Sequence, residues 1–184
     1  MTNENSKQSY ADSSGCAAEE IARLKQNLEF QCRYNIDIVG DYANHYSLLC
    51  SLVNFVSLAM SLSVVYSVFQ DEWESFTIAS GLIVGVVNAA ATAFKINDKS
   101  VEEFCRKSSY SEILTRLHSA SSLAELNQID SDMEKIQDPK RNEVSRALSY
   151  NEVRRQMGRD EVYEVGWFKR LTRFWFPWRL PSKS

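Results

Sequence analysis

Two uninterrupted runs without charged residues place the strongest constraint on how this chain folds. The first covers residues 46–70, YSLLCSLVNFVSLAMSLSVVYSVFQ, and the second covers residues 75–94, SFTIASGLIVGVVNAAATAF. They contain 25 and 20 residues without Asp, Glu, Lys, Arg or His. Because an α-helix rises about 1.5 Å per residue, each run is long enough to cross a hydrocarbon layer about 30 Å thick. The runs therefore predict two transmembrane helices.

A pair of buried helices in a soluble core is the alternative, because six serines and one asparagine make the first run only moderately apolar. However, the chain has only 184 residues, and the segments outside the runs are too polar to bury two such helices. A cleaved signal peptide is also disfavoured, since 45 mostly polar residues precede the first run. The membrane interpretation is therefore preferred.

The short break between the runs indicates how the two helices are oriented. It reads Asp-Glu-Trp-Glu at residues 71–74, and it predicts a tight external turn with Trp73 at the far interface. The segments that flank the two runs on their other sides carry the basic residues Arg33, Lys95, Lys99, Arg106 and Lys107. Positive charge favours the cytoplasmic side, so both termini of this multi-pass protein are expected in the cytoplasm.

Polar and small residues form one stripe on each run when the sequence is projected onto a helix. The stripe on the first run consists of Ser47, Ser51, Asn54, Ser57 and Ser61. The stripe on the second run consists of Thr77, Gly81, Gly85, Asn88 and Thr92. The two glycines have the G-x-x-x-G spacing that permits close helix approach.

Two arrangements of these stripes are consistent with the sequence. In one, they pack against each other within a single hairpin, with Asn54 hydrogen-bonded to Asn88. In the other, one stripe faces further copies of the chain and the other lines a polar path across the bilayer. Neither run contains an acid or a base, which excludes a proton relay or an ion-coupled transporter.

The segment before the first run is expected to consist of a disordered part followed by a helix. Residues 1–15 are polar and are expected to be disordered. Residues 16–45 carry apolar residues at helical spacing, which predicts a juxtamembrane helix that feeds directly into the first span, with Gly40 as a possible kink.

Residues 95–160 predict a small cytoplasmic layer of helices. A first helix is expected over residues 100–118, and a third over residues 142–157. Between them, Ser122-Leu-Ala-Glu125 has the spacing of a capping box and predicts a helix to about Ile136. The predicted fold class is therefore all-α, a membrane protein with a two-helix transmembrane hairpin and a small cytoplasmic helical layer.

Residues 161–184, which we call the tail, differ from the rest in composition. The stretch GWFKRLTRFWFPWRL, residues 166–180, holds three tryptophans, three phenylalanines and four bases without an acid. The chain has a net charge of −3, whereas residues 166–184 carry +5. This composition predicts an amphipathic helix on an anionic inner leaflet, ended or kinked by Pro177. Its candidate contact residues are Trp167, Lys169, Arg170, Arg173, Phe174, Trp175 and Trp178.

Two other roles for the tail are consistent with its residues. Tryptophan and arginine are the usual anchors of protein–protein contacts, so the tail could dock into a partner. Aromatic residues interleaved with bases also bind single-stranded nucleic acid. Because two predicted spans precede the tail, membrane lipids are the preferred contact, and direct nucleic-acid binding is the least favoured.

The sequence contains no pattern typical of a catalytic, metal or cofactor site. Its cysteines and histidines are Cys16, Cys32, Cys50, Cys105, His45 and His118. They show no C-x-x-C or metal-ligand spacing, and the cysteines are expected to be reduced. No glycine loop suited to phosphate and no nucleophile elbow occurs. We therefore expect a non-enzymatic protein without a cofactor.

Three features together carry a family resemblance. A polar and aromatic membrane entry, DYANHYSLL, occupies residues 41–49, and two spans joined by a very short turn follow it. The helix after them reads EFCRKSSYSEILTRL at residues 103–117. This layout resembles the SLATT family, two-transmembrane effectors of bacterial conflict systems, over roughly residues 20–120.

The resemblance implies an inner-membrane effector of bacterial antiphage defence that forms homo-oligomers. Such an effector would form a pore or disrupt the membrane, and so kill or arrest an infected cell. Family members are associated with reverse transcriptases such as those of retrons, with nucleotide-signalling enzymes, or with sensor domains. A separate sensor or control partner is therefore expected. A membrane adaptor that anchors a cytoplasmic complex and a regulatory subunit of a transporter remain the alternatives.

Overall fold

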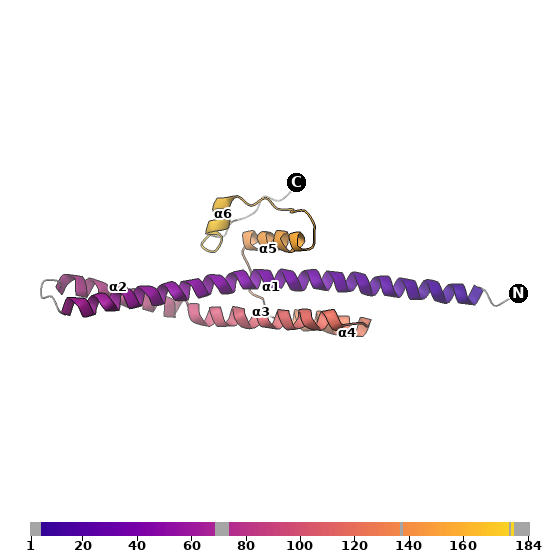
Figure 1. The fold of residues 1–184 in the computed structure, drawn as a ribbon, viewed down its shortest axis with the longest axis horizontal. Helices are drawn as coiled ribbons and strands as arrows, with labels where there is room; N and C mark the ends of the chain where they lie inside the picture. The colour runs from indigo at the N-terminus through magenta and orange to yellow at the C-terminus, as the bar shows by residue number, and fades with distance from the viewer. Residues whose placement is uncertain (1–4, 69–73, 137, 177, 179–184) are drawn as a thin grey trace. The chain divides into compact units, whose positions relative to one another are not determined.

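A computed structural model describes the chain over residues 5–68, 74–136, 138–176 and 178. Side chains are described within these ranges except at residues 5–17, 63–68 and 74–77. The described residues form helices and connecting turns without a strand, which confirms the predicted all-α fold (Figure 1). Their helices are α1 (Asn5–Val68), α2 (Glu74–Ala93), α3 (Ile96–Ser119), α4 (Leu123–Glu134), α5 (Glu143–Gln156) and α6 (Trp167–Thr172).

The chain divides into two compact units. The first, which we call the bundle unit, comprises Met1–Ile38 and Arg106–Ser184. The second, which we call the apolar unit, comprises Val39–Cys105 and contains both uncharged runs. Helices α1 and α3 each contribute residues to both units.

Helix α1 is longer than the sequence predicts. It joins the expected juxtamembrane helix to the first uncharged run as one element of 64 residues, and it continues through Gly40. It also begins at Asn5, whereas residues 1–15 were expected to be disordered. Residues 5–15 contain no proline, and adding residues to an existing helix is far easier than nucleating a new one.

One apolar face on each of four helices builds the core of the bundle unit. In α3, Tyr110, Ile113 and Leu117 follow helical spacing and are at most 5% exposed. The thiol of Cys32 in α1 donates to Met133 Sδ in α4 over 3.1 Å, in the interior of this core. The other buried apolar residues of this core are Leu28 and Ile38 in α1, Ala120 after α3, Leu126 and Ile129 in α4, and Val144, Ala147 and Val153 in α5.

The turn between α3 and α4 is held from both sides. The predicted capping box is present: the Glu125 amide donates to Ser122 Oγ, and the Glu125 carboxylate accepts from the Ser122 amide. Hydrogen bonds from the Ser121 amide, at 2.8 Å, and from the Ser122 amide to this carboxylate lower the pKa of Glu125. Across the turn, the Lys25 ammonium of α1 donates to the carbonyls of His118 (3.1 Å) and Ala120 (2.9 Å). A base at the C-terminal end of α3 satisfies carbonyls that have no partner within the helix.

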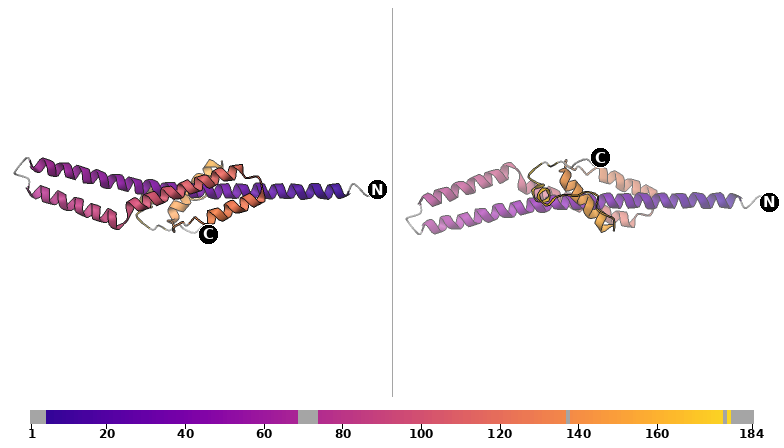
Figure 2. Two further views of the ribbon diagram at one scale, coloured as in Figure 1. Left: turned by 90° about the horizontal axis from the view of Figure 1, so that it is seen from below. Right: turned by 90° about the horizontal axis from the view of Figure 1, so that it is seen from above.

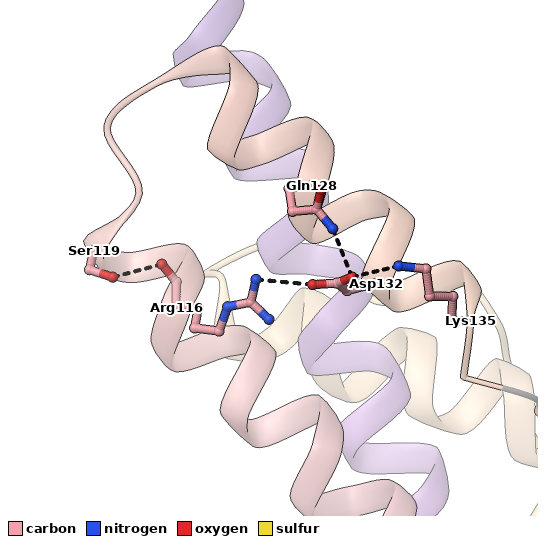
Figure 3. Close-up of polar contacts among 5 residues, drawn as sticks. All are labelled: Arg116, Ser119, Gln128, Asp132 and Lys135. Atoms are coloured by element: carbon pink, nitrogen blue, oxygen red, sulfur yellow. Dashed lines mark hydrogen bonds and ion pairs between the residues drawn. The ribbon is translucent and has the colours of Figure 1, made fainter.

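Asp132 in α4 joins α3 to α4 (Figure 3). Its carboxylate accepts hydrogen bonds from Lys135 at 2.9 Å and Gln128 at 3.0 Å, and it pairs with the Arg116 guanidinium of α3 at 3.0 Å. These hydrogen bonds, the one from Lys135 first, lower the pKa of Asp132 to about 2. The network fixes the angle at which α4 returns along α3.

Asn142, the N-cap of α5, and Asn151 within α5 hold the tail against that helix. Asn142 caps α5 by accepting from the Val144 amide at 2.9 Å, and its Nδ2 donates to the carbonyls of Arg173 and Phe176. Asn151 is 6% exposed and makes hydrogen bonds to the backbone of residues 162–163. Asn151 therefore ties the irregular segment before α6 to α5, and Asn142 ties the chain after α6 to the start of α5.

Candidate functional site

A belt of large apolar side chains is exposed on the apolar unit. In α1, Leu48, Leu52, Phe55, Leu58 and Leu62 are 58–69% exposed. In α2, Ile78, Leu82 and Val86 are 61–68% exposed. A soluble monomer rarely exposes a continuous apolar surface of this kind, so the belt needs a lipid or protein surface to cover it.

By length and composition, one described helix can cross a membrane. The part of α1 from Ala18 to Leu62 contains an 18-residue window with mean hydropathy 1.4, and none of that window is buried. Helices α2 and α3 pass the same test only as a pair, across a bend of 40°. Core helices of soluble proteins and signal sequences can have such a composition, so length and composition are weak evidence for a span. A core helix, however, is mostly buried.

Helix α2 runs back beside the second half of α1 within the apolar unit (Figure 2). The inward face of α2 includes Ser80, which is 1% exposed, and the half-buried residues Val84, Val87 and Ala91. On α1, the half-buried residues of the first uncharged run include Leu49, Cys50, Val53, Val56, Ser57 and Met60. Both inward faces are therefore mostly apolar.

The two polar stripes flank this contact instead of forming its centre. Ser47 and Ser57 of the first stripe are half-buried, whereas Ser51, Asn54 and Ser61 are exposed. Gly81, Gly85, Asn88 and Thr92 of the second stripe are all exposed. The side chain of Thr77 lies outside the described residues, as do Asp71, Glu72 and Trp73 of the expected turn.

One hydrogen bond between side chains joins the two stripes. The Ser57 hydroxyl of α1 donates to Asn88 Oδ1 of α2 over 3.1 Å. Asn54 lines the same hollow as Asn88 and Thr92, with a volume of about 330 Å³. Among the described residues, the hydrogen bond to the Asn88 side chain therefore comes from Ser57, and not from Asn54 as the hairpin arrangement expected.

The exposed hydroxyls of the stripes bond to their own helices. Ser51 Oγ donates to the Ser47 carbonyl at 3.0 Å, and Ser61 Oγ donates to the Ser57 carbonyl at 2.7 Å. Thr92 Oγ1 donates to the Asn88 carbonyl at 2.9 Å. A hydroxyl satisfied in this way can face hydrocarbon without a water partner. These hydroxyls are thus compatible with lipid contact and do not require a wet lumen.

Gly81 and Gly85 lie beside open space. A Cβ atom built at either glycine would meet no atom within 4 Å outside its own helix. The G-x-x-x-G spacing therefore does not serve the contact between α2 and α1. The flat surface that it forms is available to another helix.

Lys95 forms the break between α2 and α3. Its φ of 49° lies in the left-handed region, which a residue with a Cβ atom adopts at a cost. The Phe94 amide donates to the Ala90 carbonyl, and the Lys95 amide to the Thr92 carbonyl, so the last turn of α2 keeps its hydrogen bonds.

The tail differs from the predicted long amphipathic helix. Helix α6 ends at Thr172, and the chain turns so that the Trp178 indole N–H donates to Thr172 Oγ1 at 2.9 Å. Among the predicted contact residues, Trp167 and Trp175 are 77% and 67% exposed, and Arg170 is also exposed. Lys169, Arg173, Phe174 and Trp178 are half-buried, while Pro177 lies outside the described residues. Helical projection missed this turn because it assumes a continuous helix.

The tail still presents an apolar surface, but this surface includes residues that the sequence did not predict. Phe168, Leu171 and Phe176 are 52–70% exposed and join Trp167 and Trp175. The Arg173 guanidinium lies 4.7 Å from the centre of the Phe174 ring, a cation–π contact that keeps this base close to the aromatic residues.

No group of three or more His, Cys, Asp or Glu side chains suited to a metal ion occurs in the part of the chain that the structure describes. Comparison with known proteins adds no assignment of function: neither protein-family models, nor curated proteins, nor solved structures match the chain.

Proposed function

We propose that the apolar unit is a transmembrane hairpin of a multi-pass inner-membrane protein with both termini in the cytoplasm. The observation that carries this proposal is the exposed apolar belt on α1 and α2, located in the two uncharged runs. The hydroxyls bonded within their own helices support it, because they remove the cost of placing serine and threonine against lipid.

Self-association through the surface around Gly81 and Gly85 is the second part of the proposal. In lipid, helices associate mainly by close packing, and small residues permit it. The contact inside the hairpin leaves both glycines uncovered, so an α2 helix from another copy is the partner that we propose for them.

The biological role follows from the resemblance to the SLATT family. The protein would be a membrane effector of bacterial antiphage defence, and its oligomers would open a pore or disrupt the membrane when a control partner triggers them. A reverse transcriptase complex or a nucleotide-signalling protein would be such a partner.

Substitution of the glycines tests the assembly. Gly81→Leu with Gly85→Leu should reduce cross-linking between copies and abolish depolarisation of cells that express the chain, because leucine holds the helices apart. The matched control is Ala79→Leu with Ala90→Leu, which enlarges two exposed alanines of α2 that lie about 150° around the helix from the glycines. Unchanged cross-linking and toxicity in the glycine variant would exclude this surface.

Topology provides a separate test of the hairpin. Reporters fused after residue 100 and at residue 184 should be active in the cytoplasm, and a tag inserted within residues 70–74 should be labelled from outside. A reporter at residue 184 on the external side would contradict two spans.

A membrane adaptor is the second candidate, and the exposed aromatic surface of the tail favours it. If the protein is an adaptor, cells that express the wild type should keep their membrane potential. Replacing Trp167 and Trp175 with Ala should then abolish co-purification of a partner.

If the tail instead contacts an anionic leaflet, the same variant should lose binding to anionic vesicles, and salt should weaken the binding of the wild type.

A further inference from the structure

A groove lined by aromatic rings lies between α1 and α5 in the bundle unit, and none of the sites described above uses it. Its volume is about 530 Å³, which is in the usual range for pockets that hold small ligands. Phe30 and Tyr34 line it from α1, Tyr150 from α5, and Tyr163 from the segment after α5. Tyr150 makes edge-to-face contacts with Phe30 and Tyr163, with ring centres 5.3 Å and 5.6 Å apart.

The charges around these rings favour an anion. Arg146 and Glu143 of α5 line the groove, and the hydrogen bond from Arg146 Nε to the Tyr34 hydroxyl is long, at 3.4 Å. A neighbouring hollow of about 320 Å³ shares Phe30 and Tyr150 and adds Arg23 and Arg159. Aromatic rings alone would also suit a quaternary ammonium ion. Arg23 is paired with Glu19 at 3.5 Å, which leaves Arg146 and Arg159 against the carboxylate of Glu143, and this balance disfavours a cation.

The chain uses a buried side chain to place one of the rings. The Tyr163 ring lies on an irregular segment, and its residue is 38% exposed. Asn151, with only 6% exposure, bonds to the Tyr163 amide at 3.1 Å and to the Tyr163 carbonyl at 2.6 Å. Arg154 Nε adds a second tie by donating to the Asp160 carbonyl at 2.8 Å. These bonds hold Tyr163 at the groove although its own ring is not part of the core.

We propose that this groove binds a small aromatic anion of the mononucleotide class. A planar base fits a wall of aromatic rings, against which bases stack with little preference for sequence. A phosphate fits the guanidinium of Arg146, whose planar fork can donate two hydrogen bonds to phosphate oxygens. The site lies wholly within the bundle unit, and its ligand binding is independent of the proposed membrane assembly.

Calorimetry on the full-length protein in detergent tests this site, with AMP, GMP, CMP and UMP as separate probes. At least one nucleotide should bind, and Arg146→Gln should weaken that binding about tenfold, as expected for the loss of a charge-assisted hydrogen bond. Tyr163→Ala should also weaken it. The matched control is Arg155→Gln on the same helix, whose guanidinium pairs with Glu152 at 2.6 Å and does not line the groove, so it should bind like the wild type.

Inorganic phosphate and the nucleoside of the tightest-binding nucleotide complete the experiment, and circular dichroism checks that each variant is folded. Both should bind more weakly than that nucleotide, because each lacks one of the two recognised groups. Absence of binding by all four nucleotides at millimolar concentration would overturn the proposal. Equal binding by folded Arg146→Gln and wild type would overturn it as well, as would phosphate that binds as tightly as the nucleotide.

Discussion

Asn151 holds both backbone polar groups of Tyr163: its Oδ1 accepts from the Tyr163 amide at 3.1 Å, and its Nδ2 donates to the Tyr163 carbonyl at 2.6 Å. Because Oδ1 also accepts from the Val162 amide at 3.0 Å, one buried side chain satisfies three backbone groups of an irregular segment. This is the tie by which α5 positions the first part of the tail, before α6.

Replacement of Asn151 by Ala should loosen that segment. We expect the free energy of unfolding to fall by about 2 kcal/mol, in the range for removing one partner of buried hydrogen bonds. Amide hydrogen exchange at Val162 and Tyr163 should become faster, while exchange in α3 stays the same. Gln156→Ala on the exposed side of α5 is the control and should change neither quantity. Unaltered exchange at residues 162–163 would contradict this role.

Acid should weaken the link between α3 and α4. The pKa of Asp132 is lowered from 3.8 to about 2 by hydrogen bonds from Lys135, Arg116 and Gln128, so the ionised form is favoured in the folded protein. The stabilisation is therefore complete above about pH 4 and is lost as the pH falls towards about 2. Denaturant midpoints measured across this range should fall less steeply for Asp132→Asn than for the wild type. Asp130→Asn on the same helix, which leaves the hydrogen bonds of Asp132 in place, should follow the wild type.

The cysteines should differ sharply in reactivity. Burial, with a smaller contribution from Glu29, raises the pKa of Cys32 to about 11, so hardly any thiolate is present at pH 8. Cys105 is exposed. Iodoacetamide at pH 8, followed by peptide mass mapping, should modify Cys105 in the folded protein and Cys32 only after denaturation. Equal labelling rates in the folded state would show that the core around Cys32 opens readily.

The left-handed conformation of Lys95 predicts that glycine is more stable than alanine at this position. Lys95→Gly and Lys95→Ala remove the same charge, but alanine keeps a Cβ atom that is strained at a φ of 49°. The glycine variant should be more stable than the alanine variant by about 1 kcal/mol, after allowance for the larger entropy of unfolded glycine. Thermal unfolding in detergent measures the difference. An alanine variant of equal or greater stability would show that the break adapts without strain.

Local sequence patterns predicted most of the helices closely. Ser122 and Glu125 formed the expected capping box, and α5 begins after Asn142 as the helical spacing indicated. The second uncharged run ends at Phe94, one residue after the end of α2. These features depend on residues at most four positions apart, and neighbours along the chain determine them.

The sequence by itself thus determined the helical class, most helix boundaries and the two uncharged runs. Tertiary structure decided which faces meet: Ser80, and not the stripe with Gly81, lies inward on α2, although one position separates them. Likewise, only the return of the chain placed Trp178 against Thr172 and Tyr163 beside Tyr150. Periodicity gives the spacing of residues around one helix, but the rotation of that helix against its neighbour depends on packing between distant segments. Such contacts have no signature in the order of adjacent residues.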